Sequence, residues 1–250
     1  MTELADQQTF LDSKQNWRIS SLVPAVDTAE DGFAKAIQAI ETFNEKFSGK
    51  AIVDTVEIKA PKLEQIASTI QQMPDSLNAF LEVPHQGDPV ELIKAIAQAP
   101  DNIFAKIRTG GVTPDLIPSP AEVARFIYRC GQHQAGFKAT AGLHHPLRGD
   151  YRLTYEPDAQ QGTMFGFVNV FAAACFAFSG CELKPIEQLL VESDPNAFEF
   201  SDAGLTWNGS TVSREVIDEM RRNKAISFGS CSFTEPTLEL AELGLSAACR

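Results

Sequence analysis

The sequence predicts an α/β protein in which parallel strands alternate with helices. Short runs rich in β-branched and aromatic residues alternate with helix-length amphipathic segments through the first 180 residues, a pattern typical of consecutive βα units. The chain has 250 residues, of which 44% are hydrophobic, and a chain of this size can bury a large core without disulfide or metal support. Its slightly negative mean hydropathy indicates an ordinary globular composition.

Five expected strand-and-helix units follow one another from residue 19 to residue 180. In the first, residues 19–25 form a strand, and a cap at Asp27 or Thr28 begins a helix that continues to Lys46. The other four units are 51–60 with 63–73, 77–84 with 90–99, 102–111 with 120–131, and 136–143 with an apolar helix from Met164. This order favours a parallel sheet connected by helical crossovers.

The regular alternation ends after Gly180. Residues 181–224 are expected to form an inserted segment with a helix, a β-hairpin that turns at 202–204, and a second helix capped by Ser213. A last strand at 225–233 and a closing helix at 235–245 follow. Six parallel-type strands result, so the expected fold is one TIM-barrel-like β/α barrel spanning residues 1–250, either incomplete or closed by the hairpin.

Composition and charge narrow the functional classes. A formal net charge of -12 disfavours binding to nucleic acid backbones. The N-terminus lacks the pattern of a secretory signal, and the apolar stretch 164–180 contains Asn169 and is shorter than the roughly 20 residues of a membrane span. The expectations are therefore a cytoplasmic location and a small-molecule substrate, with no membrane partner.

The five cysteines are odd in number and lack the spacing of a metal-binding motif. Reduced thiols that pack in the core are expected, without a disulfide framework, metal or other cofactor. These residues are Cys130, Cys175, Cys181, Cys231 and Cys249.

Strand alternation places charged side chains on one face of the expected sheet. In the run 102–109, Lys106 and Arg108 oppose an apolar set suited to helix packing, so they are expected to face the barrel interior. By the same alternation, Lys138 and Thr140 face the interior from the next strand. Glu82, Glu57 and Lys59 do so from earlier strands, whereas Asp54 lies in a mainly apolar phase and its direction stays open.

A shared interior of this kind predicts a functional pocket. Burying several ionisable groups is costly unless they are paired or used. Clustered positive charge and burial both favour the neutral form of an amine, which a Schiff-base nucleophile requires. Alternatively, the same cations bind a substrate carboxylate or phosphate.

These strands resemble the deoxyribose-phosphate aldolase family of class I aldolases. Residues 51–62 resemble the strand that holds that family's catalytic aspartate, and 77–84 resemble its Ile-Glu-Thr strand. FAKIRTGG (104–111) is similar to the strand with the Schiff-base lysine, and GFKATAGL (136–143) to the strand with a second, proton-relay lysine. SFGSCSF (227–233) is similar to the family's phosphate-binding strand.

The resemblance implies an aldolase-like lyase acting on a small anionic carbonyl compound. It makes Lys106 the nucleophile, Lys138 the proton relay and Asp54 the acid/base partner. Glu82, which strand alternation places in the same interior, is also expected to support proton transfer. Gly229, Ser230 and Ser232 would hold a phosphate. The sequence departs from the family at Ile107 and Arg108, at 143–145, and in the long separation of Lys138 from Ser230.

Other residues keep two further functions open. His144 with Glu57 and Glu82 suits a divalent-metal-dependent barrel enzyme, whereas Lys106 and Arg108 with the glycine loop at Gly110 and Gly111 suit a noncatalytic anion binder. Residues 144–162 are expected to form a polar loop that covers the pocket. For Phe200 and Trp207 the alternatives are core packing and a homodimer contact.

Overall fold

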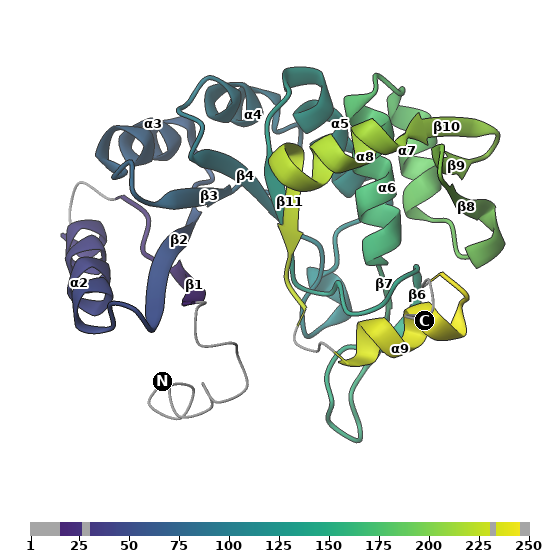
Figure 1. Cartoon of the computed structure of the whole chain (residues 1–250), viewed down its shortest axis with the longest axis horizontal. Coiled ribbons are helices and arrows are strands. Elements are labelled where there is room, and N and C mark those ends of the chain that lie inside the picture. The colour runs from purple at the N-terminus through teal and green to yellow at the C-terminus, as the bar shows by residue number, and fades with distance from the viewer. Residues whose placement is uncertain (1–15, 27–30, 231–233, 246–250) are drawn as a thin grey trace. The chain divides into compact units, whose positions relative to one another are not determined.

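The computed structural model describes residues 16–26, 31–230 and 234–245 (Figure 1). Contacts within the chain group it into two compact units. The first comprises Met1–Glu82 with Ala99–Ile103, and the second comprises Val83–Gln98 with Phe104–Arg250.

A parallel sheet with the strand order β1-β2-β3 forms the first unit. Figure 1 shows its helices beside these strands. The chain order is β1 (Trp17–Leu22), α2 (Gly32–Lys46), β2 (Ala51–Lys59), α3 (Leu63–Gln72) and β3 (Asn78–Glu82). Val56 and Ile58 of β2 are buried together with Ile40 of α2 and Ile66 of α3, so the apolar stripe of each helix covers this sheet.

A β-bulge interrupts β2 at Asp54. Ile19 of β1 pairs with Val53, but the next residue, Ser20, pairs with Thr55, which leaves Asp54 as the extra residue. The bulge shifts the alternation of side chains along β2. For this reason, the strict alternation of side chains along a regular strand does not predict which face of the sheet Asp54 occupies.

The second unit contains a parallel sheet with the order β4-β5-β11 and two small antiparallel sheets, β6-β7 and β10-β9-β8. Short 3-10 turns lie at Pro114–Leu116 and Pro195–Ala197, and a π-helical turn lies at Met220–Lys224. Its other elements are α4 (Val90–Ala97), β4 (Ile103–Arg108), α5 (Pro120–His133), β5 (Phe137–Thr140), β6 (Gly149–Arg152), β7 (Gln161–Met164), α6 (Phe167–Phe178), α7 (Leu183–Leu190), β8 (Phe198–Ser201), β9 (Gly204–Trp207), β10 (Ser210–Ser213), α8 (Arg214–Glu219), β11 (Ala225–Phe228) and α9 (Thr234–Glu242).

Helices α5 and α6 cover one face of this second sheet. Phe137 of β5 packs edge-on against Phe126 of α5, at 5.4 Å between ring centroids, and stacks against Phe178 of α6 at 6.5 Å. Phe228 of β11 stacks on Phe167 of α6 at 5.2 Å. Since neighbouring residues on a strand point to opposite faces, Lys138 lies on the face away from these helices.

Local sequence signals account for the ends and burial of these helices. Ser119 and Glu122 form a reciprocal capping box at the start of α5, and Pro120 occupies the first turn. Helix α6 is apolar around its circumference apart from Asn169, and most of its residues are buried by neighbouring elements. Within the described ranges, no helix has both the length and the apolar character needed to cross a membrane.

The parallel β/α organisation expected from the sequence is confirmed. The described residues contain six strands in parallel pairs, fewer than the strands of a closed (β/α)8 barrel. The hairpin expected at 197–209 is present as β8 and β9, with β10 as an additional strand. The Ser213 cap is also present, whereas the caps expected at Asp27 or Thr28 lie outside the described residues.

The segment 144–162 was expected to be a loop without regular structure, and that expectation was wrong in part. Gly149–Arg152 and Gln161–Met164 pair as the antiparallel hairpin β6–β7. Both strands are short and partly exposed, with few apolar residues, so the usual alternation of a half-buried strand is absent from the sequence.

Two of the cysteines have the packing role expected for them. Cys130 and Cys175 are buried free thiols, and burial raises the pKa of Cys175 to about 11. Cys181 is half-buried, while Cys231 and Cys249 lie outside the described residues.

Candidate functional site

Lys106 and Lys138 lie side by side on adjacent parallel strands of the second unit. They are register partners in the β4–β5 ladder, so their side chains leave the same face of the sheet. Lys106 is only 3% exposed and Lys138 is half-buried. Two amines are therefore paired on the face that α5 and α6 do not cover.

The loops that follow β4 and β5 are in direct backbone contact. Thr109 donates its backbone N–H to Thr140 O at 2.8 Å and its hydroxyl to Ala141 O at 2.7 Å. Ala141 and Gly142 have positive φ values of 63° and 74°, and a Cβ on Gly110 would lie 2.9 Å from Gly142 Cα. A left-handed alanine costs about 1–2 kcal/mol, and strain of this kind is common at functional sites.

Other second-unit candidates lie at the same ends of the strands. Arg108, the register partner of Thr140, is exposed. Gly229 donates its N–H to Ala139 O at 3.0 Å, which brings the end of β11 beside β5. Gly111 lies close to Leu116, whose side chain would be 2.4 Å from an added Cβ. Ser232 lies outside the described residues.

Four candidates belong to the first unit. Asp54 is ion-paired with Arg18 and accepts a 2.9 Å hydrogen bond from the Thr55 hydroxyl. Glu57 accepts a 2.9 Å hydrogen bond from the Ser20 hydroxyl. Lys59 and Glu82 are register partners at the ends of β2 and β3. The structure therefore couples Asp54 to a neighbouring arginine and places Lys59 beside Glu82.

His144 and Ser230 meet near the end of β5. The Ser230 hydroxyl lies 3.5 Å from His144 Nδ1. Burial lowers the pKa of His144, and the neighbouring His145 lowers it further, although the negative charge of Glu235 acts in the opposite direction. His144 is consequently suited to act as a neutral imidazole near pH 7.

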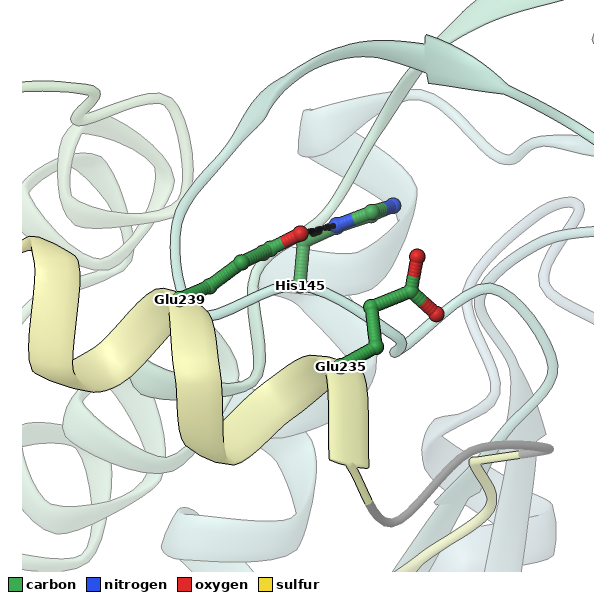
Figure 2. Close-up of side chains that lie close together, drawn as sticks. All are labelled: His145, Glu235 and Glu239. Atoms are coloured by element: carbon green, nitrogen blue, oxygen red, sulfur yellow. Dashed lines mark hydrogen bonds and ion pairs between the residues drawn. The ribbon is translucent and has the colours of Figure 1, made fainter.

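His145 forms a cluster with Glu235 and Glu239 that the sequence analysis missed. Its Nδ1 lies 2.8 Å from Glu239 Oε1, and its ring stacks on Tyr151 with the centroids 3.4 Å apart. Figure 2 shows both carboxylates directed from α9 toward the imidazole. One ligand atom from each of the three residues lies within 4.8 Å of the others.

A cavity of about 230 Å³ adjoins this cluster. Its lining includes both histidines, and Tyr155 donates a 3.0 Å hydrogen bond to Glu235 Oε2. The complete lining is His144, His145, Tyr151, Arg152, Leu153, Thr154, Tyr155 and Glu235.

The sequence predicts the proximity of the two glutamates of this cluster, but not that of the histidine. Glu235 and Glu239 are four residues apart in the expected closing helix, which places them on one helix face. Their histidine partner is 94 residues away from Glu239, and no local pattern connects the two segments. Of the metal set expected from the sequence, Glu57 and Glu82 belong to the first unit and His144 to the second, whereas the cluster of His145, Glu235 and Glu239 lies within the second unit.

Asn169 holds the histidine-bearing segment to the helical layer. It is fully buried, accepts the Arg148 N–H at 2.9 Å, and donates to Leu189 O and Glu192 O at 2.9 and 2.8 Å. These bonds satisfy carbonyl groups at the end of α7. Asn169 therefore acts in the fold and not in substrate contact.

Replacing Asn169 with alanine is expected to lower the free energy of unfolding by about 2 kcal/mol, because one buried and two half-buried backbone groups lose their partner. Urea unfolding followed by circular dichroism measures this change. Asn196→Ala, at an exposed asparagine, is the matched control and should shift the midpoint little. Equal shifts for the two variants would contradict the structural role of Asn169.

Comparison of the chain with protein-family models, curated proteins and solved structures gives no match. Functional inference for this chain therefore depends on the residues and their geometry.

Proposed function

We propose that the second unit carries out Schiff-base chemistry on a small anionic carbonyl compound, as an aldolase-like lyase. The observation that carries the proposal is the pairing of buried Lys106 with Lys138 in the β4–β5 ladder. A lysine that forms an imine needs a water-poor location and a nearby group that transfers protons. Lys138 is the neighbouring side chain that meets the second requirement.

In the proposed reaction, the neutral amine of Lys106 adds to the substrate carbonyl carbon. Loss of water then gives a protonated imine. Cleavage of the neighbouring carbon–carbon bond leaves the electron pair on the imine as an enamine and releases an aldehyde after its hydroxyl proton is removed. Protonation of the enamine carbon and addition of water release the second product and restore the amine. Lys138 is assigned the proton transfers.

The strand-end loops provide the proposed binding surface for the anionic part of the substrate. Arg108 supplies positive charge, and Thr140 supplies a hydroxyl group at the same register position. Gly110 and Gly229 allow close approach to the backbone, and Ser230 adds a hydroxyl group beside His144. Asp54 is ion-paired with Arg18, a contact that favours a structural role, so this proposal does not assign it a proton transfer.

The resemblance of 104–111 and 136–143 to the two lysine strands of deoxyribose-phosphate aldolases supports the same assignment. A TIM-barrel-like origin of the parallel strands is part of this proposal. So are a cytoplasmic location, a small-molecule substrate, and the absence of nucleic acid or membrane partners. Exposed Phe200 is the proposed contact if the protein forms a homodimer, since Trp207 packs internally against Phe176.

Borohydride trapping tests the proposed function. The full chain is incubated with acetaldehyde, pyruvate or glyceraldehyde 3-phosphate, reduced, digested and mapped by mass spectrometry. We expect a carbonyl-dependent adduct on Lys106 at concentrations that leave exposed lysines unmodified, because the imine forms first in the site. A sample reduced without a carbonyl compound is the control.

Two other outcomes would change the assignment. An adduct on Lys138 alone would reverse the roles of the two lysines. If no carbonyl compound gives an adduct while the chain binds inorganic phosphate, the chain is an anion binder and the Schiff-base function is wrong.

A further inference from the structure

We propose that His145, Glu235 and Glu239 bind a divalent transition-metal cation at the edge of the cavity lined by His144 and Tyr155. This site is distinct from the lysine pair, and the inference does not depend on Schiff-base chemistry. No other group of three histidine, cysteine, aspartate or glutamate side chains with this geometry occurs in the part of the chain that the structure describes.

The fold positions the three donors from two separate segments. His145 follows β5 and belongs to the segment that the start of α6 holds by hydrogen bonds from Phe167 N and Val168 N. Glu235 and Glu239 occupy successive turns of α9 and point to the same side. A change in the sequence of α9 can therefore remove one carboxylate without altering the histidine.

The donor atoms fit a cation that accepts both nitrogen and oxygen. Imidazole nitrogen favours zinc and related transition metals over magnesium and calcium, which prefer oxygen alone. Metal–donor distances of about 2.0–2.2 Å require donors roughly 3–3.5 Å apart in a tetrahedral site. His145 Nδ1 and Glu239 Oε1 are 2.8 Å apart, and one ligand atom from each of the three residues lies within 4.8 Å of the others, so small side-chain movements bring the donors to this spacing.

Neighbouring side chains orient the proposed ligands. Tyr155 donates a hydrogen bond to Glu235 Oε2 at 3.0 Å, which helps to orient this carboxylate. The imidazole of His145 is held by its stack on Tyr151, whose hydroxyl donates to Leu147 O at 3.1 Å. Outer contacts of this kind fix ligand geometry and contribute to metal affinity.

The cavity gives the cation an accessible coordination position. Three protein ligands leave at least one position for water or a substrate group, the arrangement of catalytic rather than structural metal sites. His145 and Glu235 both line the cavity, and Arg152 lines it as well. The positive charge of Arg152 makes a small anionic group the favoured occupant of the open position.

A hydrogen-bonded ion pair between His145 and Glu239 is the simpler interpretation of part of this geometry. It requires two of the three side chains, and it predicts no role for the position of Glu235. Substitution of Glu235 therefore distinguishes a metal site from an ion pair that only attaches α9 to the histidine segment.

The test is calorimetric titration of the chelator-treated full chain with Zn²⁺ alone. We expect one equivalent of Zn²⁺ to bind, and we expect Glu235→Gln to weaken the affinity about 100-fold because a charged ligand is lost. Glu242→Gln, at an exposed position on the same helix, is the matched control and should bind Zn²⁺ as the unmodified protein does. Thermal unfolding without metal checks that both variants are folded.

A second measurement excludes the cysteines as the zinc ligands. Co²⁺ added in place of Zn²⁺ should give visible ligand-field bands without sulfur-to-cobalt charge transfer, and His145→Gln should remove these bands. Absence of Zn²⁺ binding, equal affinity in Glu235→Gln and Glu242→Gln, or a thiolate spectrum would each overturn the proposal.

Discussion

Lys106→Met is expected to abolish the borohydride-trapped adduct and to lower turnover of the trapped carbonyl compound by about 10³-fold or more. Methionine approximates the shape of the buried lysine stem but has no amine, so the imine cannot form. Because Lys106 is only 3% exposed, a lysine on the protein surface cannot take over its buried position without a rearrangement of the fold. Steady-state kinetics and peptide mapping with the same carbonyl compound measure the two effects.

Two matched substitutions distinguish loss of the nucleophile from general damage. Lys94→Met removes a partly exposed lysine paired with Glu91 on α4 and should leave trapping and turnover unchanged. Lys138→Met should slow the proton transfers while an adduct still forms on Lys106. If Lys106→Met keeps its adduct or its turnover, the proposed chemistry does not occur at this residue.

The placement of the lysines could be predicted because it depends on local alternation. The small and apolar residues Ile103, Ala105 and Ile107 are all buried, which fixes the phase of β4 and puts Lys106 on the opposite face. The same reasoning held for β5, where Phe137 and Ala139 are buried. Parallel pairing of the two strands then follows from the helix between them.

The features that escaped prediction depend on irregular backbone or distant contacts. The bulge at Asp54 has no consistent sequence signal, so a strict period of two gave no direction for this side chain. The pairing of His145 with Glu239 spans 94 residues and requires the three-dimensional fold. The β6–β7 hairpin is short and polar, and its sequence is therefore compatible with a loop.

The two proposed sites are connected by a short stretch of backbone. Lys138 lies within β5, and His145 follows the left-handed residues Ala141 and Gly142 that end this strand. The first residues of α6 bind this segment, since Phe167 N donates a hydrogen bond to His145 O at 3.0 Å and Val168 N donates one to Pro146 O at 2.9 Å. Whatever fixes the start of α6 consequently fixes the histidines relative to β5.

Gly166 is the residue that permits this contact, and Gly166→Ala is expected to lower the free energy of unfolding by roughly 3–5 kcal/mol. An added Cβ would lie 2.2 Å from Pro146 O and 2.3 Å from Leu147 Cα, and backbone atoms cannot move aside as a flexible side chain can. Urea unfolding should give a lower midpoint with an unchanged slope, and Zn²⁺ affinity should fall because His145 moves.

Gly32→Ala provides the comparison for this prediction. Gly32 begins α2, and the nearest atoms to an added Cβ there are 3.6 Å away, so alanine should be neutral or slightly stabilising. The contrast isolates the close approach of two backbones from the intrinsic effect of replacing glycine. If Gly166→Ala has the same stability and the same Zn²⁺ affinity as Gly32→Ala, the start of α6 does not hold the histidine segment as inferred. The position of His145 would then depend on its contact with α9 alone.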